Sequence, residues 1–264
     1  MVSDPRAWKQ QACTLFEYEA EHYAKLREQE SGFRAQLGIV MRMLSGERGR
    51  ILDIGCAAGG GISDLRRMGF HVVGIDFSQS MLDYASQRFT LDPDVQFCQA
   101  DAEFLPFRSA SFDHIICLGV LEYLPDYRPT IAQISRLLRL GGLAVFSIPS
   151  RISPYYLTGE ILEGVLGPTW RALKRLASKE PPSLGKTPRH SRNLCIPWQL
   201  RHITREFGLA PDQSAFTNFF VYPLERLSPA AHDRMAEFLE PFGSIPLIAW
   251  TGSQYVLSAR KAQP

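Results

Sequence analysis

The sequence has little of several features that would point to particular classes of protein. Its five cysteines lie far apart, with no Cys-x-x-Cys pair, at positions 13, 56, 98, 117 and 195. An odd and scattered set disfavours a disulfide framework or a zinc site and fits a reducing compartment. Lys and Arg number 29 against 27 Asp and Glu, which gives a net charge of +2. This balance is not that of a dedicated nucleic-acid binder.

Long apolar stretches are also missing. No run reaches the roughly 18 apolar residues of a membrane span. The first ten residues, MVSDPRAWKQ, lack the apolar core of a secretory signal. With 45% apolar and 21% charged residues, the composition is that of a globular chain. We therefore expect a soluble, cytoplasmic protein whose 264 residues form one α/β domain with insertions or two domains.

Short apolar runs separated by helix-length segments dominate the middle of the chain. The runs begin at Arg50, His71, Asp94, Phe112 and Gly142. The helix-length segments are 60–69, 78–90 and 128–140. Alternation of this kind favours a parallel sheet with helices on both faces, and such coverage requires nearly continuous apolar strands.

The flanking regions follow other patterns. Apolar spacing predicts helix over 5–45, and a Pro/Gly/Ser-rich basic stretch in 150–196 predicts a loop or lid. A helix from Pro197 to Phe207, bounded by Gly208, precedes strands expected at 210–216, 246–251 and 254–260. The expected units are a helical cap (1–46), an α/β core (47–149), a lid (150–196) and a C-terminal part of the core (197–264) with a second insertion (217–244).

The most specific motif is a turn at the end of the first apolar run. The segment Asp53-Ile-Gly55-Cys-Ala57-Ala-Gly59 places glycines where a strand turns tightly into a helix. Glycine allows positive φ angles and close approach of a ligand to the backbone. The segment matches neither the dinucleotide fingerprint Gly-x-Gly-x-x-Gly nor a phosphate-binding P-loop. Open α/β sheets bind ligands at this carboxyl edge.

Two further strand ends carry carboxylates. Asp76 ends the second run, and its two oxygens could accept hydrogen bonds from both hydroxyls of a ribose. Asp101, followed by Ala102, ends the third run, where a carboxylate could accept from an adenine amine. Each Asp alone could be a loop or helix-cap residue. Together the three strand ends offer what the parts of an adenosine need.

These motifs resemble those of the class I S-adenosylmethionine-dependent methyltransferases. The similarity is greatest to the small-molecule branch that includes ubiquinone/menaquinone-type and biotin-pathway enzymes. It covers residues 47–149, with a weaker echo at 197–216 and 247–260. The resemblance implies a Rossmann-like, doubly wound sheet of seven strands, mostly parallel with the last strand antiparallel, under a helical N-terminal cap and lid insertions.

The resemblance also implies the cofactor, S-adenosyl-L-methionine, with S-adenosyl-L-homocysteine as product. It assigns the methionyl part of the cofactor to Asp53, Gly55, Ala57 and Gly59, and the ribose to Asp76. It places around the adenine Phe77, Met81, Asp101 and Ala102. Leu118 and Gly119 would reach the cofactor, and Tyr23 in the cap would meet its carboxylate.

Two departures from the family pattern bear on function. Ala57 stands where the family has its middle glycine. Leu121-Glu122-Tyr123 stands where many members carry Leu-x-His, so a histidine base is absent there. The candidates for a base are therefore Tyr123 and His190, although His190 is also consistent with a solvated loop residue. No clustering of acidic and histidine residues calls for a metal.

Several acceptors and roles fit the sequence. We expect methyl transfer to a small molecule of secondary or cofactor metabolism, and a basic cluster in 171–192 suits an acidic acceptor. The basic amphipathic segment 161–176 suits either a lid helix or an apolar, prenyl-type acceptor at a membrane surface, without a membrane span. A catalytically silent nucleoside-binding subunit is a further alternative. A nucleic-acid partner is disfavoured because Asn-Pro-Pro-Tyr is missing. The sequence does not predict the oligomeric state.

Overall fold

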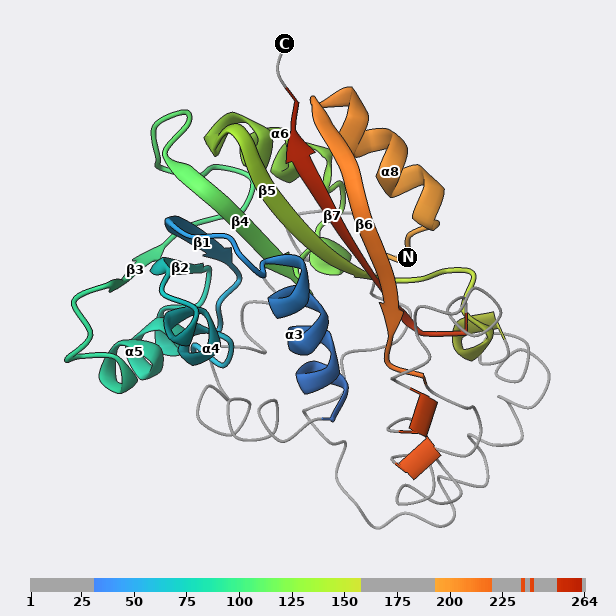
Figure 1. Cartoon of the computed structure of the whole chain (residues 1–264), viewed down its shortest axis with the longest axis horizontal. Coiled ribbons are helices and arrows are strands. Elements are labelled where there is room, and N and C mark those ends of the chain that lie inside the picture. Colours follow the sequence, from blue (N-terminus) through green and yellow to red (C-terminus); the bar gives the residue numbers. More distant parts are fainter. Residues whose placement is uncertain (1–30, 158–192, 220–233, 236–237, 240–250, 263–264) are drawn as a thin grey trace.

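The strands form a single mixed sheet. The computed structural model describes residues 31–157, 193–219, 234–235, 238–239 and 251–262. Its strands are β1 (Arg50–Ile54), β2 (His71–Asp76), β3 (Val95–Gln99), β4 (Phe112–Leu118), β5 (Leu138–Pro149), β6 (Leu209–Thr217) and β7 (Gln254–Lys261). Their order is β3-β2-β1-β4-β5-β7-β6, and only β7 runs antiparallel to its neighbours (Figure 1). The expected seven-stranded sheet with an antiparallel last strand is confirmed.

Helices cover both faces of this sheet. They are α3 (Ser31–Met43), α4 (Ile62–Arg67), α5 (Gln79–Arg88), α6 (Arg128–Leu137) and α8 (Pro197–Glu206), with a 3₁₀ turn, η1 (Leu121–Tyr123). Figure 1 shows α3, α4 and α5 on one face and α6 and α8 on the other. Because helices cover both faces at the centre of the sheet, β1, β2 and β4 are buried over nearly their whole length.

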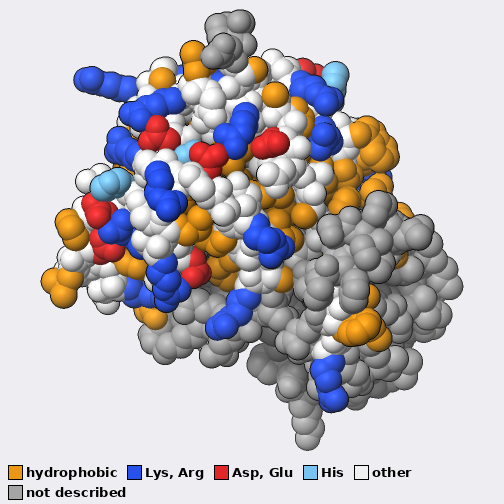
Figure 2. Space-filling model, viewed as in Figure 1, with side chains coloured by type: hydrophobic (Ala, Val, Ile, Leu, Met, Phe, Trp, Pro, Cys, Tyr) orange, Lys and Arg blue, Asp and Glu red, His pale blue; other side chains and the backbone are white. Residues whose placement is uncertain are grey.

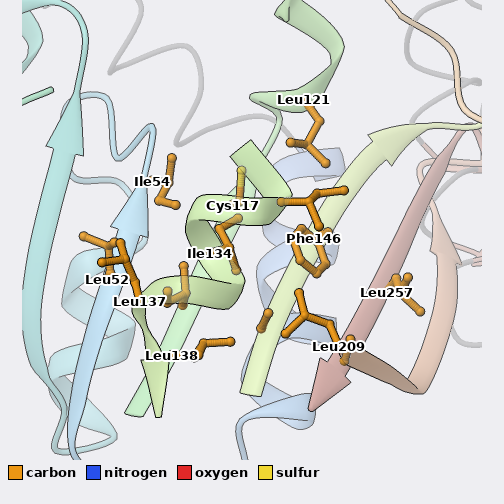
Figure 3. Packing of buried hydrophobic residues seen from close by; sticks show 14 of the residues in the cluster. Leu52, Ile54, Cys117, Leu121, Ile134, Leu137, Leu138, Phe146, Leu209 and Leu257 are labelled. Carbon is orange, nitrogen blue, oxygen red and sulfur yellow. The ribbon is translucent and has the colours of Figure 1, made fainter. Parts of the chain in front are cut away.

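Two apolar layers hold the helices to the sheet. Ile134 and Leu137 of α6 belong to the layer that contains Leu52, Phe146 and Leu257 (Figure 3). On the opposite face, Val40 of α3 and Leu44, just after this helix, pack in the layer that contains Ile51, Val72 and Val145. Adjacent residues of one strand, such as Ile51 and Leu52, thus enter opposite layers, as the two-residue period of a strand requires.

Strand β5 begins earlier than the sequence pattern predicts. We expected a helix-length segment to 140 and a strand from Gly142, but α6 ends at Leu137 and β5 starts at Leu138. The pairing of β4 with β5 shifts register between Phe112 and His114, which leaves extra residues of β5 in a bulge. A methyl group on Gly142 would lie 2.6 Å from the backbone oxygen of Asp113, so the Gly-Gly pair permits the bulge rather than ending the strand.

Several expected segments lie outside the described residues. They include the cap before residue 31, most of the lid (158–192), and most of the second insertion together with the strand expected at 246–251. The helix expected at Pro197–Phe207 is found as α8, with proline in its first turn and Gly208 (φ +73°) before β6. None of the helices in the described part of the chain is long and apolar enough to cross a membrane.

Charged side chains of both signs are interspersed over the face shown in Figure 2. Among the ion pairs, Arg66 contacts Asp92 at 2.9 Å and Asp94 at 2.6 Å, which ties α4 to the entry of β3. Arg260 of β7 contacts Glu47 at 2.7 Å, just before β1. Acidic side chains thus lie among the basic ones on this face (Figure 2), in line with the small net charge.

Candidate functional site

The turn between β1 and α4 is held against β2 by backbone hydrogen bonds. The amides of Gly55 and Cys56 both donate to the Ile75 oxygen, at 2.8 and 2.9 Å. Gly55 (φ +74°) and Gly59 (φ +80°) take the left-handed conformation that glycine adopts without penalty. A methyl group on Gly55 would also lie 2.2 Å from Val120 Cγ2, so the turn and the loop after β4 are in close contact.

Ala57 takes the place of a glycine in conformation as well as in sequence. Its φ is +46°, in a region that costs an L-residue about 1–2 kcal/mol. The Ala57 amide donates to Asp76 Oδ2 at 2.9 Å. That hydrogen bond holds the strained peptide in place, so the turn keeps a left-handed conformation at this position without glycine.

Asp76 joins the turns that follow β1 and β2. Besides the Ala57 amide on Oδ2, its Oδ1 accepts from the Ser78 amide at 2.9 Å. Burial raises the pKa of Asp76, and the hydrogen bonds from Ser78, Ala57 and Phe77 oppose that rise. A carboxylate has about four acceptor positions, so the three amides leave one for a further donor such as a hydroxyl group.

Asp53 is a strongly perturbed acid of the site. Only 6% of the residue is exposed, at the end of β1. Burial raises its pKa to about 7, and the negative charge of Asp76 adds to the rise. The carboxyl groups of Asp53 and Asp76, at neighbouring strand ends, therefore make the electrostatic potential of the site negative. A negative potential favours a ligand that carries positive charge.

The end of β3 lies beside the end of β2. The Ala100 amide donates to the Asp76 backbone oxygen at 3.1 Å. Asp101 Oδ1 accepts from the Glu103 amide at 3.0 Å, which shapes the turn that follows, and Ala102 packs partly buried next to it. The sheet thus brings Asp53, Asp76 and Asp101 to the carboxyl ends of three adjacent strands, as predicted from the motifs.

The two apolar residues expected near the adenine differ in accessibility. Phe77 is 48% exposed, and its backbone oxygen accepts from Gln99 Nε2 at 3.0 Å. Met81 is fully buried and packs with Ala57 and Ala58 beneath the turn. Phe77 is therefore available to a ligand, whereas Met81 supports the turn from below.

The loop after β4 forms the remaining described side of the site. Leu118 ends the strand half-buried, and Gly119 follows in a left-handed conformation (φ +68°). The chain then enters η1, where the Tyr123 amide donates to the Val120 oxygen at 2.9 Å. Tyr123 is half-buried in this 3₁₀ turn, three residues beyond the contact with Gly55.

The cysteines near the site are not poised as nucleophiles. Cys56 and Cys117 are both buried. Burial and the nearby Asp53 carboxyl group raise the pKa of each thiol well above its usual value. Thiolates are the reactive form, so both cysteines act as small apolar side chains here.

The structure adds residues that the motifs did not single out. Ser78 accepts from the Met81 amide at 3.4 Å and caps α5, and Ser147 of β5 accepts from the Gly119 amide at 2.9 Å. A lone serine in an apolar strand could have signalled the second contact. Tyr23 and His190, expected at the cofactor and as a base, lie outside the described residues. In the described part of the chain, no three His, Cys, Asp or Glu side chains meet as a metal site would require.

Comparison with known proteins gives consistent matches. Residues 52–146 match the family model described as "Methyltransferase domain". The chain is 32% identical to the ubiquinone biosynthesis O-methyltransferase of Paracidovorax citrulli over 174 residues, 62% of this chain and 73% of that protein. It is 28% identical to the demethylmenaquinone methyltransferase of Staphylococcus saprophyticus over 152 residues, 54% of this chain and 64% of that protein.

The fold has counterparts among solved structures. The magnesium protoporphyrin IX methyltransferase of Synechocystis, determined with S-adenosylhomocysteine bound, superposes with a TM-score of 0.61 at 16% identity. The superposition covers 96% of this chain and all of that one. At this identity the likeness establishes the architecture alone.

Proposed function

The chain belongs to the class I S-adenosylmethionine-dependent methyltransferases, and from this premise we propose that it methylates an apolar small-molecule acceptor of the quinone-precursor type. The relatives' names support this acceptor class, since they denote ubiquinone and menaquinone biosynthesis. An O-methyltransferase among them favours a hydroxyl group as the methylated position. The acceptor would bind beside the loop after β4, under the proposed lid (150–196).

The observation that carries the proposed cofactor site is the bridging position of Asp76. Its carboxylate ties the turn after β1 to the start of α5 and keeps an acceptor position for a further donor. A side chain at Gly55 would clash with Val120, so glycine at this position lets the loop after β4 lie directly against the turn. These features fit an adenosyl ligand with a methionyl tail.

Each predicted residue has a proposed part in that binding. Asp76 would accept from the ribose hydroxyls, Phe77 and Asp101 with Ala102 would border the adenine, and Met81 would support the turn. Leu118 and Gly119, with the Asp53–Gly59 turn, would border the methionyl tail, which Tyr23 would meet from the cap. The acidic strand ends would favour a cofactor that carries a sulfonium.

The bound cofactor supplies a methyl group that its sulfonium already activates for displacement. The protein's own contribution is then mainly alignment of the acceptor and exclusion of water. Tyr123 and His190 are the residues proposed to assist removal of the acceptor's proton. If the acceptor carries a prenyl chain, the enzyme would work at a membrane surface, which flotation with quinone-containing liposomes would detect.

Calorimetric titration of S-adenosylhomocysteine tests the cofactor site. We expect Asp76→Ala to weaken binding by about 1.5–3 kcal/mol, because charge-assisted hydrogen bonds to the ribose are lost. Asp83→Ala, which removes an exposed carboxylate of α5, is the matched control and should leave the affinity unchanged. A folded wild-type protein that binds neither S-adenosylhomocysteine nor S-adenosylmethionine would overturn the proposal.

Transfer of label from methyl-tritiated S-adenosylmethionine tests the acceptor class. Prenylated and short-chain catechols should take up label, and simple amines should not. Binding of the cofactor without transfer to these phenols or to any component of a cell extract would instead favour the silent nucleoside-binding subunit.

A further inference from the structure

A buried polar chain connects helix α3 to the loop after β4. Gln36 of α3 is 1% exposed, and its Nε2 donates to Ser147 Oγ in the interior. Ser147 of β5 is fully buried, and the same oxygen accepts from the Gly119 amide at 2.9 Å. Two donors from segments far apart in the sequence thus meet at one hydroxyl oxygen.

The Gln36–Ser147–Gly119 hydrogen bonds are placed where they can control the shape of the loop after β4. Gly119 is the first residue after β4, and its left-handed φ of +68° turns the backbone away from the strand. Ser147 lies directly opposite Leu118 in the pairing of β4 with β5. The hydroxyl therefore holds the first amide beyond the end of the paired strand, and it fixes the direction in which the loop leaves the sheet.

The loop after β4 also contacts the turn between β1 and α4. Val120 Cγ2 lies so close to Gly55 that a single added methyl group would clash at 2.2 Å. A shift of the Gly119 peptide would move Val120 and with it the wall of the turn. The contacts therefore run in sequence from α3, through Ser147 and Gly119, to the turn that follows Asp53.

Burial makes the loss of any one of these hydrogen bonds costly. A buried amide or hydroxyl that loses its partner has a free-energy cost larger than the bond's net contribution, because no water replaces the partner. Gln36 lies one helical turn before Val40, on the apolar face of α3, where packing alone would favour an apolar side chain. Its amide is thus directed to a specific partner.

We propose that Gln36 and Ser147 are positioning residues that set the loop 118–120 for the methionyl end of the cofactor. The inference rests on the proposed cofactor site. It separates two halves of that site: the adenosine half is held by Asp76 and Asp101, and the methionyl half depends on the Gln36–Ser147–Gly119 chain. Neither residue contacts the reacting atoms in this proposal.

The test compares two ligands by calorimetry, S-adenosylhomocysteine and 5′-methylthioadenosine, which lacks the amino-acid tail. Ser147→Ala and Gln36→Met should each weaken the binding of S-adenosylhomocysteine about 5- to 30-fold. The affinity for 5′-methylthioadenosine should stay equal to that of the wild-type protein. The double variant should lose little more affinity for S-adenosylhomocysteine than either single variant, since both substitutions break the same series of hydrogen bonds. Ser147→Thr, which keeps the hydroxyl, should retain most of the affinity.

Ser258→Ala is the matched control. Ser258 is a buried serine of β7 whose hydroxyl also accepts one backbone amide, that of Gln213 at 3.0 Å, but at the bulge of β6. The Ser258→Ala substitution should leave the affinities for both ligands unchanged, even if it lowers the melting temperature as much as Ser147→Ala does.

The outcomes are distinguishable. Equal weakening of both ligands by Ser147→Ala, or no weakening of S-adenosylhomocysteine, would overturn the positioning role while leaving the proposed function intact. Failure of the wild-type protein to bind either ligand would overturn the proposed function itself. If Ser147→Ala does not fold, Gln36→Met and Ser147→Thr carry the same comparison.

Discussion

Asp53 combines a buried position with a nearby negative charge, and this sets its titration near neutrality. An unperturbed aspartate titrates near pH 4, whereas the pKa of Asp53 lies at about 7 because of burial first and Asp76 second. Between these values the folded protein binds a proton that the unfolded chain has released. Asp53 therefore lowers stability progressively as the pH rises from about 4 through 7, and its effect levels off above that.

The same titration predicts a pH dependence of cofactor binding. If the cofactor's ammonium group lies beside Asp53, binding favours the ionised carboxylate. The affinity for S-adenosylhomocysteine should then rise about tenfold between pH 6 and pH 8, because only a small fraction of Asp53 is ionised at pH 6. Calorimetry at both pH values, in buffers of different ionisation enthalpy, would also measure the proton released.

Two controls accompany this measurement. Asp53→Asn should bind more weakly and lose most of the pH dependence. 5′-Methylthioadenosine, which has no ammonium group, should bind with little change over the same range. An affinity for S-adenosylhomocysteine that stays flat from pH 6 to pH 8 would contradict the prediction.

For single residues, the sequence predicts which residues lie at the site better than it predicts their pKa values or contacts. The strand-end motifs place Asp53, Asp76 and Asp101 correctly in the sheet. The first two follow continuous apolar runs, which became the buried strands β1 and β2, and Asp101 follows an alternating run, which became the partly exposed strand β3. The perturbed pKa of Asp53 depends on how completely neighbouring strands and helices cover it, which no local pattern contains. The roles of Gln36 and Ser147 likewise arise from contacts between residues 111 positions apart.

Among the elements, α5 begins at a residue with two functions. The side chain of Ser78 accepts from the Met81 amide at 3.4 Å and so caps the helix, while its own amide donates to Asp76. The start of α5 and the proposed ribose-binding carboxylate are thus fixed by one residue. Helix stability and the orientation of Asp76 are separable, because a change of side chain leaves the amide in place.

Ser78→Ala tests this separation. Loss of the cap should lower the free energy of unfolding by about 1 kcal/mol, equivalent to about 2–4 °C in melting temperature. The affinity for S-adenosylhomocysteine should change by less than about threefold. Thermal unfolding and calorimetry would measure the two effects. Ser86→Ala, an exposed substitution later in the same helix, should be neutral or slightly stabilising.

Elements bounded by strong local signals were predicted closely, and others were not. Helix α8 begins at Pro197 and ends before Gly208 as expected, since both residues act locally. The start of β5 was placed four residues late, because a Gly-Gly pair usually indicates a turn. Here Gly141 and Gly142 form a bulge, and only the pairing with β4 reveals it.

In the whole molecule, the proposed site and the antiparallel part of the sheet are separate. The site residues lie at the ends of β1, β2, β3 and β4, whereas β7 lies between β5 and β6 beyond them. Leu257 of β7 is nonetheless fully buried in the apolar layer that also contains Leu52 and Ile54 of β1 (Figure 3). Stability is therefore shared across the sheet, while ligand binding is local.

Leu257→Ala should show this division. The cavity left in the apolar layer should lower the free energy of unfolding by about 2–5 kcal/mol. The affinity for S-adenosylhomocysteine, measured well below the melting temperature, should stay within about twofold of wild type. Leu140→Ala, at an exposed position of β5, should change stability by less than about 0.5 kcal/mol. An affinity loss that matches the stability loss would contradict the separation.

The sequence pattern alone predicted alternating strands and helices with both faces covered, because the apolar runs were too continuous for a sheet with one wet face. The antiparallel last strand came from the resemblance to a family. Strand order has no signature in local periodicity, since it depends on which edges meet after the helices have crossed over.

The interior position of β7 also constrains how the chain can fold while it is being made. Strand β6 ends at Thr217, but the strand that separates it from β5 is complete only at Lys261, 44 residues later. At about 5–20 residues per second, a ribosome needs about 2–9 s for that interval. Throughout it, the nascent chain presents the β5 edge and β6 without their shared partner. A holdase that binds exposed strand edges would find its substrate in that interval, and synonymous codons that slow translation between 218 and 261 would lengthen it.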